Sequence, residues 1–184
     1  MNWKIINTKK ILKDRWIDVR ADECELPNGD ILKPFYVLGY PDFVNALAIT
    51  ADGRIVLNRE YRHGTQTTKL ELPSGTVDNG ETPEDAIRRE LLEETGYSFE
   101  RIIMTAKVSP NPANHTNFAY SFLAIGGVKV AEQKLDISEL IENVLITMDD
   151  FLIKLYNNEF DNAMHIASAF YGLNKLKEIH AIQK

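Results

Sequence analysis

The sequence from Gly75 to Tyr97, GTVDNGETPEDAIRRELLEETGY, reads as a glycine-bearing loop followed by a helix. Thr82 is suited to cap the helix, and Pro83 suits the first helical position. Asp85, three residues after Thr82, makes an acidic variant of the capping box. Gly96 supplies a natural stop. The stretch therefore predicts a helix that begins at Thr82-Pro83 and ends at Gly96.

Three carboxylates share one face of this predicted helix. At roughly 100° per residue, Glu90, Glu93 and Glu94 fall within a narrow sector, flanked by Ile87 and Leu91. Like charges at this spacing repel one another, so the pattern does not serve helix stability. A hard divalent cation such as Mg²⁺ removes the repulsion, because it prefers carboxylate, phosphate and water oxygens. A solvated acidic helix face is the plainer interpretation of such a cluster.

The spacing of this stretch resembles the Nudix box, G-x5-E-x7-R-E-U-x-E-E-x-G-U, in which U is a bulky apolar residue. The residues at the defined positions are Gly75, Glu81, Arg89, Glu90, Leu91, Glu93, Glu94, Gly96 and Tyr97. Such a match is far more specific than a short glycine motif. The resemblance implies a hydrolase of nucleoside diphosphates linked to another group, using Mg²⁺ or Mn²⁺. It also implies that Glu90 and Glu94 are metal ligands, with Glu93 close by.

Composition limits the class of protein. With 184 residues, 44% of them hydrophobic and 26% charged, the chain forms one domain, or one domain with a small extension. The net charge of −6 argues against nucleic-acid binding, which favours basic surfaces. Cys24 is the only cysteine, which excludes an intramolecular disulfide and suits the cytoplasm. No apolar run suggests a signal peptide or a membrane span.

The boundary within the chain is expected at Pro41-Asp42. Residues 1–41 are expected to form a small N-terminal antiparallel extension of short strands, including Trp16–Arg20 and a return strand after the turn at Pro27–Asp30. Pro34 indicates an edge or a bulge in that return strand. Strands so short need another surface, either the rest of the chain or a second copy of it.

Residues 42–184 are expected to form the main, hydrolase domain. Beyond the box helix, the pattern predicts strands at 44–50, 54–61, 101–108 and 118–125, and helices at 149–156 and 161–177. This order predicts the α/β (α+β) class, with a mixed sheet between helices. The Nudix architecture is of the same kind.

Two segments outside the box resemble ADP-ribose pyrophosphatases and related nucleotide-sugar hydrolases. Arg59–Arg62, REYR, is similar to their Q-[YF]-R segment, and Glu71–Gly75, ELPSG, to their E-[LF]-P-A-G. The resemblance implies that the backbone carbonyl of Ser74 binds metal. It also implies that Arg62 and Glu71 contact the nucleotide end of the substrate.

The segment Lys13–Trp16, KDRW, resembles an N-terminal segment of the same group. There an aromatic residue stacks on the base across a homodimer with exchanged N-terminal strands. The resemblance therefore implies a homodimer in which Trp16 contacts substrate, although Trp16 is equally suited to the core of its own small sheet. Phe35 is a second stacking candidate.

The residue that activates water is the least defined part of the predicted site. Many of these enzymes carry a catalytic Glu in the loop after the box, but residues 112–117 read PANHTN. Ser138–Asn143, SELIEN, resembles a later segment that supplies the carboxylate in other members, so Glu139 is the first candidate and Glu142 the second. His115 has a reference pKa suited to proton transfer, but a single loop His is usually a surface residue. Glu93 remains if none of these acts.

These observations predict a Mg²⁺-dependent hydrolase of a nucleoside diphosphate sugar, with ADP-ribose as the first candidate substrate. GDP-mannose is the second, because no residue in the sequence selects the base. A nucleotide-sugar sensor without hydrolytic activity is the alternative of another class. The complete set of box carboxylates argues against a sensor, which has no need of them all.

Overall fold

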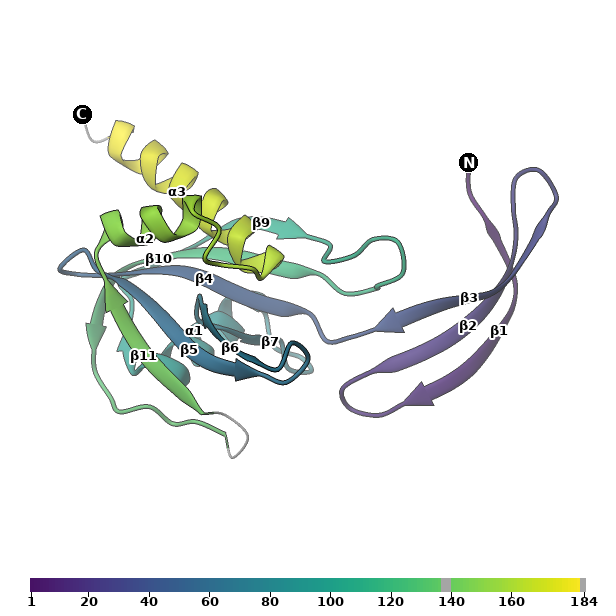
Figure 1. The fold of residues 1–184 in the computed structure, drawn as a ribbon, viewed down its shortest axis with the longest axis horizontal. Coiled ribbons are helices and arrows are strands. Elements are labelled where there is room, and N and C mark those ends of the chain that lie inside the picture. The colour runs from purple at the N-terminus through teal and green to yellow at the C-terminus, as the bar shows by residue number, and fades with distance from the viewer. Residues whose placement is uncertain (137–139, 183–184) are drawn as a thin grey trace. The chain divides into compact units, whose positions relative to one another are not determined.

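The computed structural model describes residues 1–136 and 140–182, and the chain divides into two compact units (Figure 1). The first unit comprises Met1–Asp42 and Ser109–Phe118. The second comprises Phe43–Val108 and Ala119–Lys184.

The first unit is built on a three-stranded antiparallel sheet of β1 (Lys4–Lys13), β2 (Asp18–Glu25) and β3 (Ile31–Gly39). The strands have ten, eight and nine residues, so the expectation of short strands is wrong. The predicted strand at Trp16–Arg20 is correct only for Asp18–Arg20, the start of β2. The Asp14 carboxylate accepts hydrogen bonds from the Trp16 and Ile17 amides, which places these two residues in the turn before β2.

The second unit contains an eight-stranded sheet in the order β11-β5-β4-β10-β8, with β6 beside β5, β7 beside β4 and β9 beside β10. Its strands are β4 (Phe43–Thr50), β5 (Ile55–Arg62), β6 (Thr67–Glu71), β7 (Ser74–Thr76), β8 (Tyr97–Ser98), β9 (Arg101–Val108), β10 (Ala119–Lys129) and β11 (Ile141–Ile146). Because β10 runs parallel to β4 while β9 runs antiparallel to β10, the sheet is mixed, as predicted.

Strand β4 is buried on both faces, which explains its nearly continuous apolar sequence. Leu47 and Ile49 belong to one core cluster, with residues of α2 (Met148–Tyr156) and α3 (Ala163–Ile182). Val44, Ala46 and Ala48 belong to the other, with residues of α1 (Pro83–Thr95). Since alternate residues of a strand point to opposite faces, α1 covers one face of the sheet and α2 and α3 the other. The predicted arrangement of a sheet between helices is confirmed.

The ends of α1 follow the predicted signals. The Thr82 hydroxyl accepts a hydrogen bond from the Asp85 amide at 3.2 Å, and Pro83 is the first helical residue. Gly96 ends the helix with a φ of +73°, and a Cβ there would lie 2.1 Å from the Ala131 carbonyl oxygen. Glycine therefore satisfies both the left-handed backbone and the close approach.

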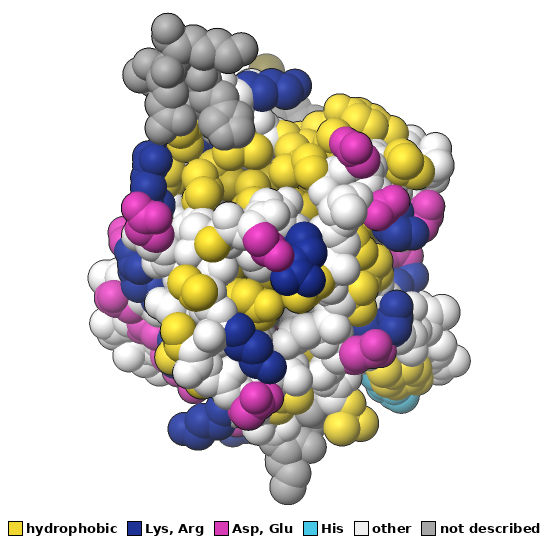
Figure 2. Space-filling view, turned by 90° about the vertical axis from the view of Figure 1, so that its left-hand side faces the viewer, with side chains coloured by type: hydrophobic (Ala, Val, Ile, Leu, Met, Phe, Trp, Pro, Cys, Tyr) yellow, Lys and Arg dark blue, Asp and Glu magenta, His cyan; other side chains and the backbone are white. Residues whose placement is uncertain are grey.

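The surface of the molecule carries charges of both signs. Figure 2 shows one face, on which Lys and Arg side chains are interspersed with Asp and Glu and form no basic stripe. Within the described residues, no helix has the length and apolar character needed to cross a membrane.

Candidate active site

Glu90 and Glu94 are buried, with 8% and 4% of their surface exposed. They lie on the face of α1 that also buries Ile87 and Leu91, whereas Leu92 is exposed. A solvated acidic helix face is therefore the wrong interpretation of these two carboxylates. Because buried charges need partners, their surroundings indicate what they do.

Glu94 is held by polar groups from three strands. Its Oε2 accepts hydrogen bonds from Asn58 Nδ2 at 2.9 Å and from the backbone amide of Ser74 at 3.0 Å. Asn143 Nδ2 donates to Asn58 Oδ1 at 2.9 Å and so fixes the orientation of that amide. Sequence reasoning missed both asparagines. Asn58 follows the buried apolar run Ile55–Leu57, a signal that could have found it, whereas Asn143 has no comparable local signal.

Gly75 lets the backbone of β7 approach the Glu90 carboxylate. A Cβ at this position would lie 2.0 Å from both Cδ and Oε1 of Glu90, which is far inside van der Waals contact. The glycine is therefore needed for space, since its φ does not lie in the left-handed region. This approach brings the Ser74-Gly75 backbone and the Glu90 and Glu94 carboxylates together.

We expect Gly75→Ala to fold but to lose about 10²-fold in kcat/KM, because a catalytic group displaced by about 1 Å can cost that much. The added methyl group displaces the Glu90 side chain, and overpacking of this kind destabilises a fold by about 1–3 kcal/mol. Steady-state kinetics beside a thermal melt separates the two effects. Activity near the wild-type value in a folded variant would show that the position of Glu90 does not matter.

Arg89 neutralises part of this acidic cluster. Its guanidinium donates to Glu81 Oε1 and Oε2, both at 3.0 Å, and to the Thr76 carbonyl at 3.0 Å. It also donates to Glu90 Oε1 at 2.8 Å and to Glu93 Oε2 at 3.2 Å. The hydrogen bond to Glu81 raises the pKa of Arg89, and the same contact lowers the pKa of Glu81. The like-charge repulsion along α1 is thereby offset without a metal ion.

The residues of this cluster fit a hard divalent cation. Across the described residues, no three His, Cys, Asp or Glu side chains come together as a complete metal cage. Mg²⁺ does not require one, because it is commonly held by one or two carboxylates together with substrate phosphates and waters. Glu90 and Glu94, beside the Ser74-Gly75 backbone, provide oxygen donors of this type, and the space that Gly75 leaves at Glu90 agrees with this use.

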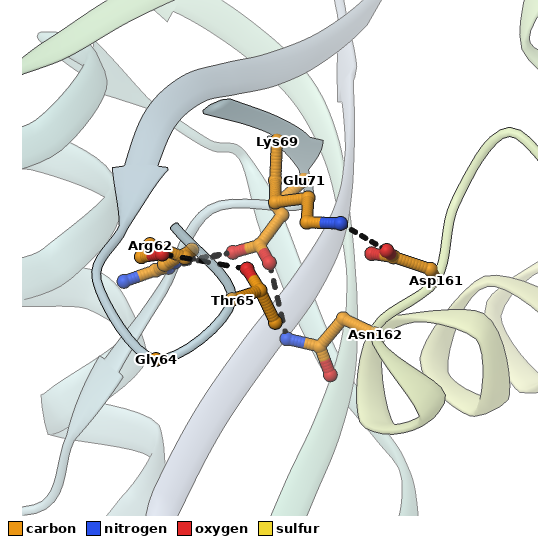
Figure 3. Close-up of a pocket in the computed structure, with 7 residues that line it drawn as sticks. All are labelled: Arg62, Gly64, Thr65, Lys69, Glu71, Asp161 and Asn162. Atoms are coloured by element: carbon orange, nitrogen blue, oxygen red, sulfur yellow. Dashed lines mark hydrogen bonds and ion pairs between the residues drawn. The ribbon is translucent and has the colours of Figure 1, made fainter. Parts of the chain in front are cut away.

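A second polar site lies at the ends of β5 and β6, where a pocket of about 260 Å³ contains Arg62 and Glu71. Arg62 donates from Nε and Nη2 to Glu71 Oε2 at 2.9 and 2.6 Å. Asn162 Nδ2 donates to Glu71 Oε1 at 3.3 Å (Figure 3). The structure thus brings together the predicted pair Arg62 and Glu71 and adds Asn162, which precedes α3 and which sequence reasoning missed.

His165 is a buried neighbour of the Arg62–Glu71 pair. It is 4% exposed, and its Nδ1 lies 3.8 Å from Glu71 Oε2 without a hydrogen-bond partner in the described part of the chain. Burial lowers the pKa of His165 to about 4, Glu71 opposes that shift, and Arg62 adds to it. The imidazole is therefore neutral in the folded protein at neutral pH.

We expect acid to destabilise the fold through His165. Unfolded histidine takes up a proton near pH 6.5, whereas folded His165 does so only near pH 4. Between these values the unfolded state binds more protons, so the free energy of unfolding falls as the pH falls, by up to roughly 3 kcal/mol. Urea unfolding at pH 7 and pH 4.5 measures the free energy of unfolding of the wild type and of His165→Gln. The difference between their pH dependences is the contribution of His165. Equal pH dependence of the two proteins would refute it.

Of the other predicted site residues, Glu93 joins the first cluster through Arg89. Glu142 instead forms an exposed ion pair with Arg59 at 2.8 Å. His115 belongs to the first unit, where its ring lies 5.1 Å from that of Tyr40. Glu139 lies outside the described residues.

The two stacking candidates also belong to the first unit. Trp16 is exposed, with the Arg15 guanidinium 4.2 Å from its ring centroid, so it is not a core residue of its sheet. Phe35 makes an edge contact with Trp3, with centroids 5.4 Å apart. Their roles toward substrate stay predictions.

Comparison with known proteins identifies the family. A model described as "NUDIX domain" matches residues 39–165. The chain belongs to the Nudix family. A second model, "Nucleoside diphosphate sugar hydrolase N-terminal domain", matches residues 3–38 of this Nudix protein. Nudix hydrolases generally depend on divalent metal ions, in agreement with the oxygen donors at Glu90 and Glu94.

Three relatives match four fifths or more of this Nudix hydrolase. It is 30% identical over 182 residues to an ADP-ribose pyrophosphatase of Bacillus subtilis (strain 168). The aligned residues make up 98% of this chain and 95% of the relative. It is 31% identical over 150 residues to a methanol dehydrogenase activator of Bacillus methanolicus, with 81% and 80% covered. A crystal structure of an ADP compounds hydrolase superposes with a TM-score of 0.85 at 23% identity, over 97% and 96% of the two chains. That last similarity concerns the fold alone.

Proposed function

We propose that this Nudix hydrolase cleaves the pyrophosphate bond of a nucleoside diphosphate sugar, with ADP-ribose the first candidate and AMP and ribose 5-phosphate the products. The observation that carries the proposal is the pair of buried carboxylates, Glu90 and Glu94, on the same unit as the Arg62–Glu71 pocket. The match of residues 3–38 to a nucleoside diphosphate sugar hydrolase model and the similarity to an ADP-ribose pyrophosphatase support the substrate class.

Each residue has a distinct task in the proposed reaction. Glu90, Glu94 and the Ser74 carbonyl hold the cation, for which we propose Mg²⁺ with Mn²⁺ as a substitute. When bound, the cation supplies charge neutralisation at the pyrophosphate and makes a water molecule more acidic. Arg62 binds the substrate through its guanidinium, which Glu71 orients.

A carboxylate is proposed to orient the attacking water and accept its proton. Of the candidates, Glu93 and Glu142 are held in ion pairs with Arg89 and Arg59. The local sequence context, resembling that of a catalytic carboxylate, keeps Glu139 as the first candidate and Glu142 as the second, with His115 and Glu93 behind them.

The N-terminal extension, residues 1–41, is proposed to complete the site of a second copy in a homodimer with exchanged strands, while residues 42–184 form the hydrolase domain. The apolar side chains Ile5, Ile11 and Leu12 are exposed along β1 and support this proposal. We expect a dimer by light scattering at micromolar concentration. A fully active monomer would refute it.

A cytoplasmic location stays a prediction from the single cysteine.

A substrate panel tests the proposed function. The wild-type chain is incubated with Mg²⁺ and, separately, ADP-ribose, GDP-mannose and other nucleoside diphosphate derivatives, and kcat/KM is ranked. We expect ADP-ribose to rank first. Preference for GDP-mannose would keep the reaction but change the base, whereas no turnover of any member would reject the proposal.

A further inference from the structure

The pocket beside Arg62 is lined by polar and charged residues and by Gly64. Its lining consists of Arg62, Gly64, Thr65, Lys69, Glu71, Asp161 and Asn162 (Figure 3). None of these offers an aromatic or large apolar surface, on which a nucleobase would stack. The pocket therefore suits a group covered with hydroxyl and phosphate oxygens better than it suits a base.

Glu71 is already occupied by protein partners. It is buried, its Oε2 accepts both hydrogen bonds from Arg62, and its Oε1 accepts from Asn162. Glu71 is therefore a positioning residue that holds the Arg62 guanidinium. Arg62 Nη2 also pairs with Glu60 Oε2 at 3.0 Å, but 39% of the Arg62 side chain stays exposed and can donate to a phosphate.

The segment just before α3 forms the opposite wall of the pocket. Lys69 on β6 pairs with Asp161, whose carboxylate is half-exposed, and Figure 3 shows the Lys69 amino group pointing toward it. Asn162 accepts a hydrogen bond from the Met164 amide at 3.2 Å through Oδ1 and donates to Glu71 through Nδ2. The start of α3 thereby fixes this wall against the strands.

The chemistry of Asp161 and Lys69 matches a sugar. A carboxylate accepts hydrogen bonds from vicinal hydroxyls, as acidic residues do toward ribose in nucleotide-binding proteins. An ammonium group donates up to three hydrogen bonds to hydroxyl oxygens. Because the two charges neutralise each other, the Lys69–Asp161 ion pair costs little free energy in the protein without substrate.

We propose that this pocket is the subsite for the sugar phosphate half of the substrate, in which Asp161 and Lys69 bind the sugar hydroxyls and Arg62 faces the phosphate. The proposal rests on the proposed function and assigns sugar specificity to the junction between α2 and α3. It differs from the expectation that Arg62 and Glu71 contact the nucleotide end.

Binding of the two products separately tests this assignment. Ribose 5-phosphate and AMP are titrated calorimetrically into the full chain with Mg²⁺ present. Asp161→Asn keeps the size of the side chain but removes its charge, so we expect the Kd of ribose 5-phosphate to rise about 10-fold. The Kd of AMP stays within about twofold. Glu159→Gln, which removes the same charge from the Lys154–Glu159 ion pair of the same junction, is the matched control and leaves both Kd values unchanged.

Other results would overturn the proposal. A weaker Kd for AMP alone would place the nucleotide end in this pocket, and equal weakening of both ligands would make Asp161 a general support. Unchanged binding of both ligands, or wild-type protein that does not bind ribose 5-phosphate at millimolar concentration, would reject the subsite. Lys69→Gln provides a second variant with the same expectation if Asp161→Asn does not fold. Failure of the proposed function is read separately, from turnover by the wild type.

Discussion

Glu94→Gln is expected to lower kcat by about 10³-fold or more. The substitution removes a charged ligand, and charge stabilisation by a bound metal is worth several kcal/mol in the transition state, each 1.36 kcal/mol being tenfold in rate. The fold should survive, because the Gln amide oxygen can accept the same hydrogen bonds from Asn58 and the Ser74 amide. Kinetics at saturating Mg²⁺ and a thermal melt measure the two expectations.

Glu84→Gln is the matched control for this variant. Glu84 lies on the same helix, but its carboxylate pairs with Arg88 at the surface. The control should keep wild-type turnover. If Glu94→Gln were nearly as active as this control, Glu94 would not be a metal ligand.

Glu139→Gln is expected to lower kcat by roughly 10²–10⁴, the usual scale for losing a general acid or base, with a smaller change in KM. Glu142→Gln tests the competing candidate three residues along the chain, and we expect a smaller effect because its carboxylate is held in the ion pair with Arg59. His115→Ala should also have little effect. Steady-state kinetics of the three variants under one condition decides between them.

A crippled His115 variant would assign the chemistry to the loop at 109–118 instead. If Glu142→Gln alone lost activity, the second carboxylate candidate would be correct. If none of the three mattered, Glu93 would remain as the base on α1, at the cost of its contact with Arg89.

The sequence predicted the parts of the site that depend on local spacing. The start of α1 at Thr82-Pro83, its end at Gly96, and the position of Glu90 and Glu94 on the face of Ile87 all lie within one short stretch of chain. Helix periodicity and capping chemistry operate over one or two turns, so a single sequence contains them.

Contacts between segments that are distant in the chain could not be predicted from the sequence. Asn162 forms a hydrogen bond with Glu71, which lies 91 residues away in the sequence, and Asn143 forms one with Asn58, 85 residues away. Nothing near these asparagines in the chain indicates their partners, because the partners are set by the packing of α3 on the sheet and by the pairing of β11 with β5. The length of β1 was also missed, since its exposed residues lack the alternation that marks a half-buried strand.

The most direct test of the central claim is identification of the products formed from ADP-ribose by the wild-type chain with Mg²⁺, using chromatography and phosphorus NMR. The account predicts AMP and ribose 5-phosphate in equal amounts, and loss of turnover when a chelator removes the metal. Release of ADP and free ribose, or turnover that survives the chelator, would contradict it.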